Sequence, residues 1–243
     1  MRNVYINATV ARLTLRGVLG RRRTALLVIL PVLLVVIAAA VQAMTDVEDR
    51  TIRDVLAGFA VGTVVPLVGV IAGTGTIGPE IDDGSIVYLL SKPVSRFKII
   101  LTKLLVAASV TLTFAAVPTF IAGLVLAGAD GQVAVAYGLA AVVASIAYSS
   151  IFLLLGVVTR HAVVVGLVYA LVWEGLFCGL IEGARTLSVL QWSLSLAERI
   201  AGDDVVDASV ALPVAGVLLV VVTCAATWFA GHRLRSFTLA GEN

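Results

Sequence analysis

The stretch TALLVILPVLLVVIAAAVQAM, residues 24–44, contains no charged side chain. An α-helix rises about 1.5 Å per residue, so a run of this length crosses the ~30 Å hydrocarbon core of a bilayer. Five further apolar runs follow along the chain. The predicted spans are approximately residues 24–44, 56–77, 99–127, 133–158, 162–181 and 210–231.

The composition agrees with a membrane-embedded chain. Of the 243 residues, 60% are hydrophobic and only 13% are charged, and the mean hydropathy is +1.08. A soluble domain of this size cannot hide so much apolar surface in one core. Helices are expected because isolated strands leave backbone groups unsatisfied in lipid, and the runs lack the alternation of a barrel wall. The predicted fold class is an all-α polytopic membrane protein with a single transmembrane domain, residues 1–243.

Basic residues are unevenly distributed between the two sides that alternating spans define. One side holds both termini and the loop 80–96, and carries Arg2, Arg12, Arg16, Arg21, Arg22, Arg23, Lys92, Arg96, Lys98, Lys103, Arg160, Arg233 and Arg235. The other side carries Arg50, Arg53, Arg185 and Arg199. Lys and Arg favour the cytoplasmic side of a membrane. We therefore predict a multi-pass protein of the cytoplasmic membrane with both termini in the cytoplasm.

Two further segments have the pattern of helices at a membrane surface. Within residues 1–23, helical spacing relates Val4, Ala8, Ala11, Leu15 and Val18, with Arg12 and Arg16 on a neighbouring stripe. This favours a helix on the inner surface, the alternative being a disordered basic tail. In the external connection 182–209, one helical face holds Leu187, Leu190, Leu194 and Ala197. Trp192 is expected to anchor this short helix at the headgroups, the alternative being a structureless loop.

The sequence contains no convincing motif for catalysis, metal binding or nucleic-acid binding. The run GTGTIG, residues 73–78, ends a predicted span instead of joining a strand to a helix, so we interpret it as a packing or helix-end feature. The sequence contains no G-x-x-x-x-G-K-[ST] phosphate-binding loop. Cys178 and Cys224 lie far apart in apolar runs, and the net charge is only +2. We expect no catalytic residue, no metal, no cofactor bound by this chain and no nucleic-acid partner.

Small residues and one acid stand out inside the spans. G-x-x-x-G spacings occur at residues 58–62, 69–73 and 175–179, which suit close helix packing or a subunit contact. Glu174 is the one acid deep in an apolar run. A carboxylate in hydrocarbon normally faces a partner or a water-filled cavity. We therefore consider Glu174 a candidate pathway acid or a structural acid, and the sequence leaves both open.

The polar stretch between the second and third spans carries the most specific pattern. It reads Glu80, then GSI at residues 84–86, LLS at 89–91, PVSR at 93–96, and Lys103 at the start of the third span. This order resembles the signature of ABC-2 type transporter permeases. The resemblance implies six spans, cytoplasmic termini, an N-terminal surface helix and short external helices before the last span. It also implies two permease copies, identical or paired with a paralogue, above two separate ATPase subunits that bind ATP and Mg²⁺.

In that family the first cytosolic loop carries a coupling helix that docks on the ATPase, and these residues agree. Asp82 and Asp83 precede a potential helix over residues 85–91, where negative charge suits the helix N-terminus. Ile86, Leu89 and Leu90 form an apolar face on an otherwise polar element, which suggests a docking partner. We assign ATPase coupling to Glu80, Asp82, Asp83, Ile86, Leu89, Leu90 and Arg96. Arg96 and Lys103 are also expected to anchor the loop at the lipid headgroups.

The resulting hypothesis is the permease subunit of an ABC transporter, with export expected because the family mostly comprises exporters. Its partners are then ABC ATPase subunits, a second permease copy and membrane lipid. Two alternatives stay open: an ATP-independent secondary transporter that uses Glu174, and an integral membrane protein without transport activity. The sequence does not specify the transported substrate.

Overall fold

The computed structural model describes residues 8–44, 49–82, 84, 95–128, 131–202 and 206–236. Within these ranges every regular element is a helix. Six of the described helices are long and apolar enough to cross a membrane. They are Arg23–Met44, Arg50–Ile81, Arg96–Ala127, Gly131–Val158, Ala162–Leu180 and Leu212–Leu234. The predicted fold class, an all-α polytopic membrane protein, is confirmed.

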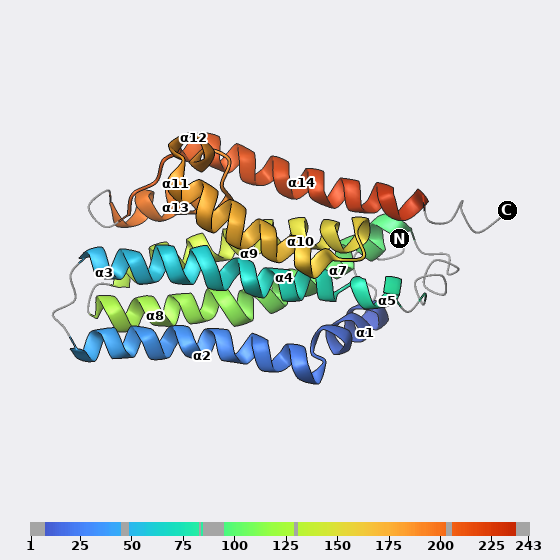
Figure 1. The fold of residues 1–243 in the computed structure, drawn as a ribbon, viewed down its shortest axis with the longest axis horizontal. Helices are drawn as coiled ribbons and strands as arrows, with labels where there is room; N and C mark the ends of the chain where they lie inside the picture. Colours follow the sequence, from blue (N-terminus) through green and yellow to red (C-terminus); the bar gives the residue numbers. More distant parts are fainter. Residues whose placement is uncertain are drawn as a thin grey trace, which may run out of the picture.

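Three of the six spans are built from consecutive helical segments, and Figure 1 shows the spans running side by side along one axis. The second span comprises α3 (Asp49–Arg53), the π-helix η1 (Asp54–Val64) and α4 (Val65–Gly75), followed by α5 (Gly78–Asp82). The third comprises α7 (Arg96–Thr111), η2 (Leu112–Ala116) and α8 (Val117–Ala127). The fifth comprises α10 (Ala162–Val168), η3 (Tyr169–Phe177) and α11 (Cys178–Leu180). The remaining helices are α1 (Ala8–Val18), α2 (Arg21–Met44), α9 (Gly131–Val158), α12 (Glu182–Arg185), α13 (Val189–Ala201) and α14 (Leu212–Ser236).

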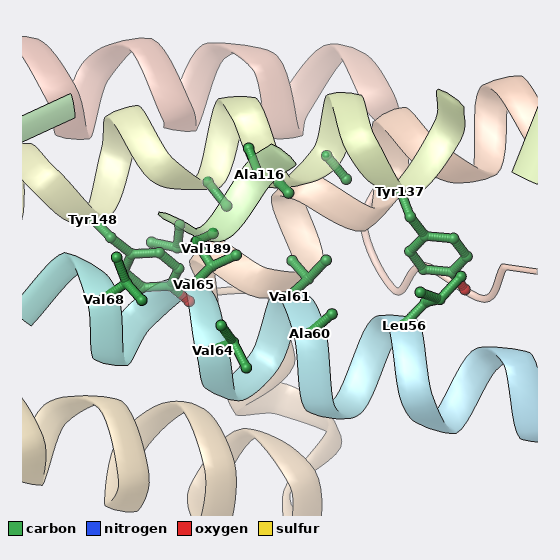
Figure 2. Close-up of a cluster of buried hydrophobic side chains, with 14 of the residues drawn as sticks. Leu56, Ala60, Val61, Val64, Val65, Val68, Ala116, Tyr137, Tyr148 and Val189 are labelled. Atoms are coloured by element: carbon green, nitrogen blue, oxygen red, sulfur yellow. The ribbon is translucent and has the colours of Figure 1, made fainter. Parts of the chain in front are cut away.

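The second and fourth spans form the centre of the bundle. They are its most buried spanning helices, whereas the first, fifth and sixth spans expose most of their surface. Figure 2 shows part of the packed core, where Leu56, Val61 and Val65 of the second span lie beside Tyr137 and Tyr148 of α9. Exposed valines and leucines on the outer helices suit a hydrocarbon environment, because lipid tails are as apolar as leucine.

Glycine allows the two central helices to approach closely. A Cβ atom added to Gly73 of α4 would lie only 2.7 Å from Cβ of Phe152 and 3.0 Å from the backbone nitrogen of Leu153. Gly69 faces Tyr148 and Phe152 in the same way. The G-x-x-x-G spacing at residues 69–73 therefore packs α4 on α9 within one chain.

Two prolines lie where π-helical turns give way to α-helix. Pro66 follows η1 as the second residue of α4, and Pro118 follows η2 as the second residue of α8. Proline lacks a backbone N–H and its ring clashes with the carbonyl of the preceding turn. A wider turn at this point accommodates that clash without ending the span.

The two ends of the bundle differ. One end holds α1, α5, the start of α7 and the end of α14, and the other holds α3 and α11 to α13 (Figure 1). Helix α1 lies within the predicted segment 1–23, with Thr14 and Val18 buried and Arg12 and Leu13 exposed. Its position on a membrane surface stays a prediction.

Trp192 corrects one expectation for the connection 182–209. The predicted headgroup anchor is wrong, because Trp192 is only 4% exposed and its indole N–H donates to the carbonyl oxygen of Thr186 at 2.8 Å. Helix α13 packs against α9 and α14, so its apolar face is buried in protein. Leu187, which was expected on that face, precedes the helix and is exposed.

Candidate functional site

The predicted coupling residues lie around the connection between the second and third spans. Glu80 belongs to α5, which ends at Asp82, and Arg96 is the first residue of α7. Gly84, at a φ of 70°, donates its N–H to the carbonyl oxygen of Ile81 at 3.2 Å. Only glycine adopts this backbone conformation readily. Asp83, Ile86, Leu89 and Leu90 lie outside the described residues, as does the predicted coupling helix.

A buried ion pair joins the two sides of this connection. Nζ of Lys103 lies 2.7 Å from Oε1 of Glu80, and it also donates to the carbonyl oxygen of Thr76. The Lys103 side chain is fully buried, whereas that of Glu80 is 29% exposed. A charge buried this deeply needs both a counter-charge and hydrogen-bond acceptors, and these two residues supply them.

Lys103 therefore does not anchor the loop at the headgroups, and that expectation is wrong. The residue lies two turns into α7, where its side chain turns inward to α5 instead of extending along the span to water. Lys103 turns inward because the carboxylate of Glu80 and the carbonyl oxygen of Thr76, at the end of α4, both accept hydrogen bonds from its ammonium group. The pair links α5 to α7 two turns beyond the start of α7.

Arg96 lies at the other side of the same connection. It is half-buried at the first turn of α7, and its Nη1 is buried without a hydrogen-bond partner among the described residues. The preceding residue, Ser95, is extended, and its carbonyl oxygen accepts from the N–H of Lys98 at 2.9 Å. The span therefore begins sharply at Arg96.

Glu174 occupies a second polar site at the opposite end of the bundle. Its side chain is buried, with the residue only 3% exposed. Oε1 accepts from the hydroxyl of Tyr169 at 3.1 Å and from the backbone N–H of Val189 at 3.0 Å. Oε2 accepts from the hydroxyl of Ser188. Three donors thus converge on one carboxylate, which favours the structural interpretation of this acid.

The contacts of Glu174 fasten α13 to the fifth span. Ser188 is the N-cap residue of α13, and its hydroxyl oxygen accepts from the N–H of Gln191 at 3.3 Å. Val189 supplies one of the N–H groups that a helix N-terminus leaves without an intrahelical partner. The sequence did carry a signal for this cap, because S-x-x-Q at residues 188–191 is a capping-box spacing. It gave no sign that the partner would be Glu174.

Other contacts hold α13 and its connection in place. Arg185 donates from Nε to the carbonyl oxygen of Cys178 at 3.1 Å and from Nη2 to that of Gly179 at 3.2 Å, which satisfies carbonyls at the end of the fifth span. At the other end of α13, Gln132 of α9 donates to the carbonyl oxygen of Ile200. Glu198 accepts from the N–H of Ala208 at 3.2 Å. The helix is thereby fixed at both of its ends.

A polar groove of about 530 Å³ opens beside Glu174, between η1, η3 and α13. Its lining includes both basic and acidic side chains, from Arg53, Asp54, Glu174, Arg185 and Asp207. Charged groups in or near hydrocarbon need water or a partner. A groove lined in this way is suited to water or a polar partner and not to lipid tails.

Two of the three G-x-x-x-G spacings line this groove. Gly58, Gly62, Gly175 and Gly179 all contribute to its walls. A Cβ atom added to Gly58 or Gly179 would meet nothing within 4 Å. Gly58 and Gly179 therefore do not pack helices within the chain, unlike Gly73, and their missing side chains keep the groove wide. Gly62 does pack on α13, because a Cβ atom added there would lie 3.3 Å from Cδ2 of Leu190.

The part of the chain that the structure describes contains no site for metal binding or disulfide formation. No group of three His, Cys, Asp or Glu side chains there is placed to hold a metal ion. Cys178 is a buried free thiol and Cys224 is an exposed one on α14. No disulfide joins them.

The chain is a multi-pass α-helical membrane protein. It has six helices suited to span a membrane, a buried ion pair at the base of one polar loop and a polar groove at the opposite end. The chain belongs to the ABC-2 transporter family, because the model of the ABC-2 family transporter protein matches residues 8–188. The matched region ends at the N-cap of α13. No curated protein shows significant similarity to the chain. The resemblance to ABC-2 type permeases is confirmed, and the chain is a membrane transport permease.

Proposed function

We propose that this chain is the membrane-spanning subunit of an ATP-driven exporter of the cytoplasmic membrane. ATP and Mg²⁺ bind to separate ATPase subunits, because the sequence has no phosphate-binding loop of its own. The chain is not itself an enzyme. Membership of the ABC-2 family is the observation that carries this proposal.

The connection between α5 and α7 is the proposed docking site for the ATPase. The ion pair between Lys103 and Glu80 supports this role, because it links α5 to α7 on the two sides of the connection. A force applied to the connection then acts on both the second and the third span.

A second permease copy or a paralogue is proposed to complete the pathway. The polar groove beside Glu174 supports this, because its charged lining lies on the outside of a single chain. Such groups are unfavourable in hydrocarbon, so in this proposal a second subunit or a shared aqueous path covers them. Both termini and the loop 80–96 then face the cytoplasm, as the distribution of Lys and Arg indicates.

Co-purification tests the proposal. The tagged chain is expressed with the ATPase encoded beside it, and retention of the ATPase is measured with ATP hydrolysis and transport in liposomes. Truncating Leu89 and Leu90 to Ala should release the ATPase, since each anchor contributes about 1–3 kcal/mol. Leu180→Ala combined with Leu187→Ala, at two exposed leucines of the opposite end of the bundle, is the matched control and should retain it. Parental binding and transport by the double leucine variant would contradict the coupling role.

A further inference from the structure

A second, unrelated groove lies between α1 and α7, at the end of the bundle that also holds α5 (Figure 1). It has a volume of about 400 Å³. A water molecule occupies about 30 Å³ of liquid, so the groove holds roughly a dozen groups of that size. This is room for a stretch of hydrocarbon, and far more than a single ion needs.

The α7 wall of the groove is apolar in character. Thr102, Leu105, Val106 and Ser109 share one helix face by their spacing, and all four line the groove. The Thr102 hydroxyl donates to the carbonyl oxygen of Lys98 and the Ser109 hydroxyl donates to that of Leu105, each at 2.7 Å. The two hydroxyl hydrogens are therefore used within α7, and the wall presents mainly carbon atoms.

The α1 wall combines apolar side chains with one cation. Ala11 and Leu15 line the groove, and Leu15 is 41% exposed. Arg12 lines it as well and is exposed. Within the described part of the chain, Arg12 forms no hydrogen bond or ion pair, and no carboxylate lines this groove. Its guanidinium supplies the one positive charge among the described residues that line the groove.

We propose that this groove binds one anionic phospholipid, with an acyl chain along the α7 face and the phosphate on Arg12. A guanidinium matches phosphate oxygens in geometry and charge. An apolar wall on a membrane-spanning helix selects a ligand that carries hydrocarbon at that depth. The unequal distribution of Lys and Arg places this end of the bundle at the cytoplasmic leaflet, where anionic lipids attract basic side chains. The proposal does not depend on coupling to an ATPase.

Lipid retention by the purified full-length chain tests the headgroup contact. The chain in detergent is titrated with dioleoyl phosphatidylglycerol and, separately, with dioleoyl phosphatidylcholine, and bound lipid is counted by native mass spectrometry. Arg12→Gln should lower the affinity for phosphatidylglycerol about fivefold, the usual contribution of one basic residue near anionic lipid. Its affinity for phosphatidylcholine should fall less, because the choline cation of that lipid already offsets the phosphate charge. Arg199→Gln, an exposed arginine on α13, is the matched control and should bind both lipids as the parent does.

Filling the groove tests the acyl-chain contact. Val106→Trp should reduce the binding of both lipids, whereas Leu101→Trp, exposed on α7 outside the groove, should reduce neither. Thermal unfolding in lipid-free detergent verifies that the variants fold, and Ser109→Leu replaces Val106→Trp if that variant does not. Parental preference for phosphatidylglycerol in Arg12→Gln, or parental lipid binding in the filled variant, would overturn the proposal. Displacement of the lipid by millimolar inorganic phosphate would also overturn it, in favour of a free-anion site.

Discussion

Lys103 and Glu80 show how one residue pair joins two helices that are separate in sequence. They are separated by 23 positions in sequence, yet their charged atoms lie 2.7 Å apart. Desolvating an ammonium group is costly, and the carboxylate together with the Thr76 carbonyl offsets that cost. The free energy of unfolding should therefore fall when one partner is lost, and fall much less when both are lost.

Removing Glu80 alone should destabilise the protein. Glu80→Gln leaves the Lys103 ammonium buried without a counter-charge, and we expect a loss of about 1–3 kcal/mol, since Glu80 is partly solvated. The double variant Glu80→Gln with Lys103→Met should recover most of that loss, because no buried charge remains. Thermal unfolding of the detergent-purified protein measures both. Lys98→Gln, an exposed neighbour on α7, is the control; a Glu80→Gln variant as stable as this control would refute the role of the pair.

We expect Glu174 to contribute mainly to the packing of α13 against the fifth span. Glu174→Gln keeps the size of the side chain but replaces an acceptor oxygen by an NH₂ group, so either Ser188 or the Val189 N–H loses its partner. A buried donor without a partner costs about 1–3 kcal/mol. We expect a lower unfolding temperature and faster proteolysis of residues 182–188. Glu198→Gln, where the side chain accepts one N–H, should have a smaller effect. Parental stability combined with lost transport would instead assign Glu174 to the pathway.

At the scale of elements, the sequence predicted where the spans are but not what covers each helix. The length of uncharged runs is a direct consequence of bilayer thickness, which is why the six spans were predictable. Helical periodicity marks an apolar face without identifying its neighbour. The face that includes Leu194 and Ala197 was expected at the outer membrane surface, yet it packs inside the protein against α9.

The polar sites were less predictable than the spans, because they depend on contacts between distant segments. The sequence singled out Glu174 as an acid inside a span and Lys103 as part of the loop pattern, but their partners follow only from how the helices are arranged. The π-helical turns before Pro66 and Pro118 have the same origin. A proline within a span predicts a disturbance of the hydrogen-bond pattern, while the neighbouring helices decide which turn absorbs it.

At the scale of the whole molecule, the chain has two chemically different ends. One end carries the ion pair and the groove with Arg12, and the other carries the polar groove with Glu174. In the proposed function an ATPase engages the cytoplasmic end of the permease, so the orientation in the membrane decides which site belongs to coupling. The distribution of Lys and Arg predicts that the connection between α5 and α7 faces the cytoplasm.

Thiol labelling in intact cells tests that orientation directly. Single cysteines are introduced at Ser95, before α7, and at Gly131, at the start of α9, because both positions are exposed. Cys224→Ser removes the exposed native thiol, while Cys178 is buried and can stay. An impermeant maleimide should label the Gly131→Cys variant in intact cells and the Ser95→Cys variant only after the membrane is permeabilised. The reverse pattern would place both grooves on the opposite sides of the membrane, and the Lys103 and Glu80 pair would then lie where no cytoplasmic ATPase can reach it.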